Sequence, residues 1–273
     1  MSNEITEASG LGAAMTPEQW ASFVLEHLSH QAVVLAAGAR RINTDSKTIH
    51  VPRILSDGTV AWLDELEEIV NDRPEGNDLQ LSPRKVGCLN VLSNESVEDS
   101  DPSELDAVGQ AMLRAIGLAA NAAIWHGAGG KQPLGILEDD PLPSVNGNVS
   151  YANVVRAAGT IMAAGGVPDV LFASPLDLVE LQLATDGMDR PLVQPDASQG
   201  ASRTIAGLTI WLTAGEAVVA QANQIVVAVR KDASVAFSTD ARFSSDGTLI
   251  RVICRIDAGV NDPAGLCVIE GGS

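Results

Sequence analysis

The glycine-rich stretch after residue 126 is the part of the sequence that comes nearest to a site for phosphate chemistry. Gly127-Ala128-Gly129-Gly130-Lys131 combines glycines with a lysine, the residue types that cradle phosphates in nucleotide-binding loops. Such a loop also needs a glycine at position 125 and a Ser or Thr at position 132, where this sequence has Trp125 and Gln132. The stretch follows a predicted helix and not a strand, so we favour a flexible helix-exit loop over a phosphate site.

Histidines and cysteines offer two further kinds of chemistry. His27 and His30 could face one side of a helix, but no H-E-x-x-H pattern or third ligand accompanies them. We therefore favour two solvent-facing histidines over a zinc site. The cysteines lie far apart with no C-x-x-C spacing, which predicts small buried apolar residues in a reducing compartment: Cys88, Cys254 and Cys267.

A serine nucleophile and a calcium loop are equally poorly supported. Ser174 lacks the G-x-S-x-G context of a hydrolase and precedes Pro175, which favours a helix cap. Three acidic groups lack the spacing of a calcium loop and favour a solvated or intersubunit acidic face: 64–68, 98–101 and 138–140. We therefore predict a protein that is not an enzyme, with no catalytic, cofactor-binding or metal site and no cofactor.

The overall composition argues against two classes of partner. The chain of 273 residues has 35 acids against 17 Lys and Arg, a net charge of −18. Such a charge disfavours tight binding to nucleic acid or to an anionic membrane. The first fifteen residues carry two acids and no base, unlike a signal peptide. No apolar run reaches the ~18 residues that span a bilayer. These features predict a globular protein that is cytosolic where it is made.

Residues 1–93 are predicted to be a thin structure that needs support. Residues 1–15 suggest an extended arm, followed by a helix that Thr16 caps and Gly38 ends. From residue 47 the apolar residues alternate. We predict a hairpin of Thr48–Leu55 and Thr59–Leu63 around a Ser-Asp-Gly turn, then an extended run over Leu79–Leu92. Together 47–93 predict a long two-stranded arm, too thin to bury a core alone.

The rest of the chain predicts a long helix and an α/β block. Asp101 caps a helix that runs to about Trp125, with apolar residues on one face: Leu105, Val108, Met112, Ile116, Ala119 and Ala123. Residues 127–150 predict a loop. The α/β block over 151–230 holds helices at 154–164 and 175–184 and strands at 170–173, 204–212 and 224–229. Strands are also predicted at 234–237, and later strands at 248–256 and 266–269 return to the first domain.

Several of these segments resemble one known family. The resemblance lies in the order of the following pieces: Trp62-Leu63-x-Glu65, Arg84-Lys85-Val86, Leu92-Ser93-x-Glu95, Asp99-Ser100, the glycine-rich exit from 127 and Pro133-Leu134-Gly135-Ile136. In this order over 47–137 the chain is similar to the major capsid proteins of tailed phages, of the Hong Kong 97 type. Beyond 137 the sequence agrees with that family only in layout.

The resemblance implies an α+β Hong Kong 97-type capsid fold in four parts. These parts are an N-terminal arm and helix (1–46), an extended β-hairpin loop (47–93), a peripheral domain with a spine helix (94–150 and 231–273) and an axial α/β domain (151–230). It implies a virion protein, assembled in the host cytoplasm, that forms pentamers and hexamers and closes into an icosahedral shell. The shell would enclose double-stranded DNA without specific binding and without a membrane. Scaffolding, portal and decoration proteins are further partners of such shells.

The resemblance and the residue types also suggest where copies of the chain touch. The expected intersubunit contacts are Trp62, Glu65, Arg73, Arg84, Lys85 and Trp20. Trp62 is the first choice as an anchor, because Trp is enriched at interface hot spots. Packing of Trp62 under its own hairpin is an equally good interpretation. Some family members crosslink a Lys to an Asn, but 247–255 offers no Asn and no Glu, so we predict no such bond.

Two other functions compete with the phage shell. An encapsulin, a bacterial shell that holds cargo enzymes, shares the fold and has about this length. Genes for a terminase and portal, or for a cargo enzyme, would distinguish the two. A monomeric enzyme or binding module is a separate class, which size-exclusion chromatography would separate from capsomers or megadalton shells.

Overall fold

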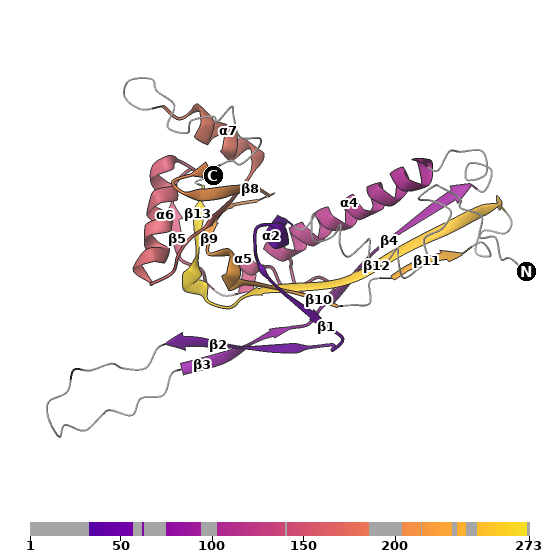
Figure 1. Ribbon diagram of the computed structural model, residues 1–273, viewed down its shortest axis with the longest axis horizontal. Coiled ribbons are helices and arrows are strands. Elements are labelled where there is room, and N and C mark those ends of the chain that lie inside the picture. Colours follow the sequence, from indigo (N-terminus) through magenta and orange to yellow (C-terminus); the bar gives the residue numbers. More distant parts are fainter. Residues whose placement is uncertain are drawn as a thin grey trace, which may run out of the picture.

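The computed structural model describes residues 33–56, 62, 75–93, 103–139, 141–185, 204–213, 215–230, 234–238 and 245–271. They form two sheets, a two-stranded hairpin and helices packed around them (Figure 1). Most of the helix predicted from Thr16 lies outside these residues, and the described part of that span contains the short helix α2 (Val33–Ala36). Gly38 follows with φ 106°, so the helix ends where predicted, at a residue that tolerates positive φ.

The first sheet gathers strands from both ends of the chain. Its order is β1 (Arg40–Thr44), β10 (Ile225–Arg230), β12 (Gly247–Val260) and β11 (Ser234–Ser238), and β4 (Arg84–Ser93) also pairs with β12. β1 and β10 are parallel, and the other pairs are antiparallel. β10 therefore joins the sheet of the late strands, although the predicted boundary at residue 230 places it in the α/β block.

A long helix, α4 (Ser103–His126), lies against β4 and β12 and confirms the predicted spine. The predicted apolar face is correct at Met112 and Ile116, which are buried. It is wrong at Ala119, which is exposed, while Ala120 is buried. The buried stripe continues at Ala120 and Ile124 because successive steps of three and four residues keep it on one side of the helix.

The second sheet carries two helices on one face. Its order is β5 (Ser144–Asn146), β13 (Leu266–Glu270), β9 (Ala217–Ala220), β6 (Val170–Ala173), β8 (Leu208–Leu212) and β7 (Thr204–Ile205). The helices α6 (Tyr151–Ala163) and α7 (Pro175–Leu183) share one apolar cluster with it. Ser174 caps α7 in a capping box with Asp177, so the predicted cap is confirmed.

Several details of this sheet differ from the prediction. The strand predicted over Thr204–Leu212 is a β7–β8 hairpin, because Ala206 and Gly207 both have positive φ and form a two-residue turn. β13 pairs with β9 and β5, so its predicted return to the first domain is wrong. Among the strands and α-helices of the described residues, four were not predicted: β1, β5, β9 and α5 (Ile136–Asp139).

One apolar core joins the two sheets. Trp125, near the end of α4, meets Phe172 of β6 edge to face, with ring centroids 4.9 Å apart. The same cluster holds alternate residues of β10 and β12 from the first sheet and of β13 from the second. The two sheets are therefore packed on a shared core.

The hairpin pairs strands that lie further apart in the sequence than predicted. β2 (Ile49–Ser56) pairs with β3 (Glu75–Leu81). Ser56, the first residue of the predicted Ser56-Asp57-Gly58 turn, is instead the last residue of β2. The rest of that turn and the predicted strand at 59–63 lie outside the described residues, except for Trp62. The predicted run Leu79–Leu92 is two strands, because Pro83 has no backbone N–H to continue the ladder. Figure 1 shows the hairpin extending from below the first sheet, away from α4.

Candidate assembly surface

The root of the β2–β3 hairpin packs on the face of the first sheet opposite to α4. Val51, Leu79 and Leu81 are buried against two residues of β10, Val226 and Ala228. Gly259 of β12 lies beneath them, where an added Cβ would come within 2.8 Å of a Leu79 methyl. The hairpin therefore approaches the sheet closely at this glycine, and a side chain here would force the Leu79 side chain to shift.

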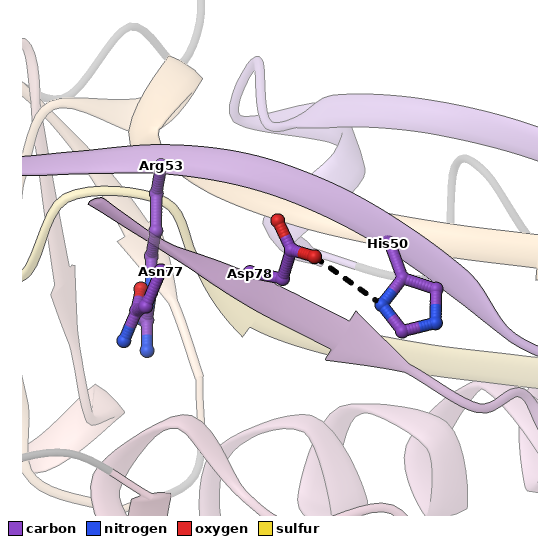
Figure 2. Close-up of polar contacts among 4 residues, drawn as sticks. All are labelled: His50, Arg53, Asn77 and Asp78. Atoms are coloured by element: carbon purple, nitrogen blue, oxygen red, sulfur yellow. Dashed lines mark hydrogen bonds and ion pairs between the residues drawn. The ribbon is translucent and has the colours of Figure 1, made fainter.

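A buried arginine ties the hairpin to the end of β12. Arg53 is only 8% exposed, and its Nη1 donates to the carbonyl oxygen of Val260 at 3.0 Å. Its Nε donates to Oδ1 of Asn77, directly across the hairpin (Figure 2). One side chain thus links both hairpin strands to the sheet. On exposed neighbouring positions, His50 and Asp78 form an ion pair at 3.7 Å.

A buried carboxylate makes a second polar link at the same root. Asp257 of β12 is 7% exposed and accepts hydrogen bonds from the backbone N–H groups of Ser82 and Ala258. Burial raises the pKa of Asp257 above its ordinary value, although both hydrogen bonds and the nearby Arg84 act in the opposite direction. The pKa is raised because desolvation of a charged carboxylate outweighs these favourable contacts.

The part of the first sheet beyond the hairpin root has an open face. On β4, residues 85, 87, 89, 91 and 93 are exposed, whereas 86, 88 and 90 are half-buried. On β12, buried residues at 250, 252, 254 and 256 alternate with more exposed ones at 249, 251, 253 and 255. We call the outward-facing residues of this side the open face: 85, 87, 89, 91, 93 and 251 are exposed, and 249, 253 and 255 are half-buried. It is the side away from α4.

The open face is both apolar and basic. Leu89 is 61% exposed and Val91 43%, which is unusual for large apolar residues on two neighbouring positions of one face. Lys85 lies directly opposite Arg255 in the register, and Arg251 lies opposite Leu89. None of the nine positions holds an acid. In a chain with a net charge of −18, such a face suits an acidic partner with apolar side chains.

The predicted contact residues fall into three groups. The Trp62 side chain is fully exposed, so it does not pack under its own hairpin. Arg84 and Lys85 are exposed, but they belong to β4 of the first sheet and not to the hairpin as predicted. Trp20, Glu65 and Arg73 lie outside the described residues.

The sequence prediction missed the two residues that hold the hairpin. Arg53 and Asp257 stand in ordinary strand patterns, and their partners are far away in the sequence. Arg53 and Val260 are 207 residues apart, and Asp257 and Ser82 are 175 apart. No local signal distinguishes them, although a charged residue inside an alternating apolar strand is a reason to look for a buried partner.

The glycine-rich stretch forms a tight turn. Gly135 donates its N–H to the carbonyl of Gly127 at 2.8 Å. A Cβ at Gly127 would lie 2.2 Å from the Pro133 oxygen, and one at Gly135 would lie 2.4 Å from the Trp125 oxygen. Close backbone packing at the end of α4 thus explains Gly127 and Gly135, whereas positive φ explains Gly129 (φ 74°) and Gly130 (φ 72°).

The three cysteines all lie in strands: β4, β12 and β13. Cys254 and Cys267 are buried as predicted, whereas Cys88 is half-buried, and all three are free thiols. In this part of the chain no group of three or more His, Cys, Asp or Glu could hold a metal ion. Among the described helices, none has the length and hydropathy to cross a membrane.

Comparisons with known proteins agree with this architecture. The major capsid protein of Klebsiella oxytoca phage phiKO2 is 23% identical over 307 aligned residues, covering 99% of this chain and 71% of that protein. The capsid of a native GTA particle superposes with a TM-score of 0.71 at 13% identity, over 99% of this chain and 96% of the other. A structure from Mycobacterium phage Adephagia superposes with a TM-score of 0.69 at 16% identity, over 100% of this chain and 95% of the other.

These structural matches show that the fold is the α+β capsid fold that the sequence pieces resemble. The model of the phage capsid family matches residues 12–271, nearly the whole sequence. The chain therefore belongs to the phage capsid family.

Proposed function

We propose that this capsid protein is the major subunit of an icosahedral shell of a tailed double-stranded DNA phage, built from pentamers and hexamers. The observation that carries the proposal is the family match over residues 12–271. The matched relatives include a phage major capsid protein and the capsid of a GTA particle, which favours a phage shell over an encapsulin. The role is structural, and the net charge of −18 suits a wall that encloses DNA without adhering to it.

The hairpin and the open face supply a complementary pair of surfaces for assembly. Between the two strands of the hairpin, residues 57–74 contain six acids and one arginine, a net charge of −5, along with Trp62, Leu63 and Leu66. The open face presents Leu89 and Val91 among basic residues. We infer that residues 57–74 of one copy lie on the open face of a neighbouring copy.

The predicted intersubunit contacts take their places in this arrangement as proposals. From one copy, Trp62 would contribute apolar area and Glu65 negative charge. On the neighbouring copy, Lys85 would contact both residues. Arg73, Arg84 and Trp20 remain proposed contacts without an assigned partner.

We further propose that the first sheet with α4 forms the peripheral part and the second sheet with α6 and α7 the axial part. Scaffolding, portal and decoration proteins remain proposed partners.

The oligomeric state of the purified chain tests the shell proposal. Sedimentation velocity and negative-stain electron microscopy should show capsomers or closed megadalton shells. A stable monomer of the mass of one chain, 28.4 kDa, under all assembly conditions would contradict it.

A charge-reversal series tests the proposed contact. The double variant Lys85→Glu with Arg251→Glu should lose shells, because it places acids opposite the acidic hairpin segment. The matched control is Lys131→Glu, an exposed lysine in the glycine turn and not on the open face, and it should assemble normally. Adding Glu65→Lys and Glu68→Lys to the double variant should restore assembly. Normal assembly of the double variant would refute this contact.

A further inference from the structure

Asp257 lies directly under the point where the hairpin joins the first sheet. It is on the same side of β12 as Gly259, two residues further on, and Gly259 touches Leu79 and Leu81 of the hairpin. The register partner of Asp257 on the neighbouring strand β10 is Ala228, which belongs to the apolar cluster that packs against the hairpin root. The hairpin therefore covers the Asp257 carboxylate and accounts for its burial.

The carboxylate joins two backbone segments that differ in direction. Its Oδ1 accepts from Ala258 at 2.9 Å, within its own strand, and its Oδ2 accepts from the N–H of Ser82. Ser82 is the first residue after β3, and it is followed by Pro83 and then by β4. The hydrogen bond to Ser82 thus holds the chain at the residue where the hairpin ends and the sheet begins.

A cavity lies beside this link. Its volume is about 450 Å³, and residues of the hairpin root and of the glycine turn both line it. Leu79, Leu81 and Ser82 line one side, and Gly129 and Gly130 line the other. The apolar packing of the hairpin root is therefore interrupted on the cavity side, while Val226 and Ala228 support the root from the sheet.

We propose that Asp257 is a positioning residue for assembly, whose carboxylate fixes the direction in which the hairpin leaves the first sheet. The inference rests on the proposed function, because that direction decides which part of a neighbouring copy the hairpin reaches. Arg53 holds the hairpin further along, at Val260. Two hydrogen-bonded links at different points along the hairpin fix its angle to the sheet, whereas a single link would let the hairpin rotate about that point.

Two other charged residues line the same cavity as Asp257. Arg84 of β4 lowers the pKa of Asp257, and Asp139 of α5 raises it; desolvation by burial is the largest cause and raises it. The hairpin and the glycine turn contribute only uncharged residues to the cavity lining, among them Gln80 and Gln132. Removing the charge of Arg84 or of Asp139 therefore shifts the pKa of Asp257 in opposite directions and leaves the hydrogen bonds of Asp257 in place.

The sign of the pH effect follows from the raised pKa. A hairpin that tilts away exposes Asp257 and returns its pKa toward the ordinary 3.8. Asp257 binds its proton more tightly when the hairpin covers it. The hairpin is therefore held on the sheet most strongly below pH 3.8, and this attachment weakens as the pH rises through the raised pKa of Asp257. Opening should increase by up to about tenfold for each unit by which the docked pKa exceeds the ordinary one.

Hydrogen–deuterium exchange of the full-length chain measures this opening. The readout is the exchange of the peptide spanning 79–85, corrected at each pH for intrinsic exchange. In the wild type it should rise through the Asp257 titration, and in Asp257→Asn the pH step should disappear. Arg84→Gln should move the step to higher pH and Asp139→Asn to lower pH. Asp169→Asn is the control, because that carboxylate binds the backbone N–H of Ala222 at 2.8 Å away from the hairpin, and it should leave the step unchanged.

The outcomes separate this inference from the proposed function. Identical exchange at 79–85 in the wild type, Arg84→Gln and Asp139→Asn would overturn the positioning role, even if Asp257→Asn fails to fold. Opposite shifts in the two charge variants, with fewer closed shells in Asp257→Ala, would support it. If the wild type shows the pH step but never assembles, the positioning of the hairpin stands and the shell proposal fails.

Discussion

Replacement of Arg53 by alanine is the most direct perturbation of the hairpin attachment. The change removes the hydrogen bonds to Asn77 and to the Val260 carbonyl, both made by a guanidinium that is 8% exposed. A hydrogen bond to a charged group contributes about 1.5–3 kcal/mol, and a buried carbonyl left without a donor costs about 1–3 kcal/mol. Loss of the desolvation cost of the buried charge offsets part of this. We expect the free energy that holds the hairpin on its own first sheet to fall by about 2–4 kcal/mol.

The control is Arg41→Ala. Arg41 is an exposed arginine on β1 whose Nε donates to Asn43 Oδ1 at 2.9 Å, so it makes a similar bond in solvent. Its loss should cost less than about 0.5 kcal/mol.

The assay is hydrogen–deuterium exchange of peptides from β2 and β3, with shell yield measured on the same samples. A loss of about 2 kcal/mol corresponds to about a 30-fold rise in exchange through opening. Equal exchange in Arg53→Ala and Arg41→Ala would refute the argument that the buried link holds the hairpin.

Three further predictions concern local features. Gly135→Ala should abolish soluble folded protein, because the new Cβ would lie 2.4 Å from the Trp125 oxygen. Gly130→Ala has nothing within 4 Å of its Cβ but a φ of 72°, so in thermal melting it should lower the free energy of unfolding by only about 1–2 kcal/mol. Ser174→Ala should lower the free energy of unfolding in urea by about 1 kcal/mol through loss of the α7 cap, and an unchanged midpoint would contradict this. Burial raises the pKa of Cys254 to about 12, so this thiol should resist aromatic disulfide reagents at pH 8 until the protein unfolds; labelling in the native state would contradict this.

The elements that the sequence predicts correctly have strong local signals. The spine helix has a long apolar stripe, the helix after Ser174 has a serine–proline start, and the strand at Val170–Ala173 is a short apolar run. Each signal lies within a few residues of the element it predicts, so no knowledge of the tertiary structure is needed.

The errors come from pairings between distant segments. β10 and β13 are both short apolar strands, and nothing in either sequence indicates which sheet it joins. β9, with the sequence Ala-Val-Val-Ala, is buried at every position, so it has no alternation to reveal it. Sheet membership depends on non-local pairing, for which strand propensity is a weak guide.

The candidate surface was predictable in part. The resemblance to capsid proteins pointed to Trp62 and Lys85, and the structure leaves both side chains exposed. The open face follows from alternation along β4, which becomes clear only when that strand is separated from β3 at Pro83. Asp257 was not predictable, because a single acid in an apolar strand does not reveal which backbone N–H will reach it.

The central claim is that copies of this chain form a shell in which the hairpin of one copy lies on the open face of another. A cryo-electron microscopy reconstruction of assembled particles tests it most directly. We expect residues 57–74 to lie over β4 and β12 of a neighbouring copy, with Trp62 close to Leu89 and acids close to Lys85 and Arg251. A reconstruction in which that face is solvent-exposed, or is covered by its own chain, would contradict the account.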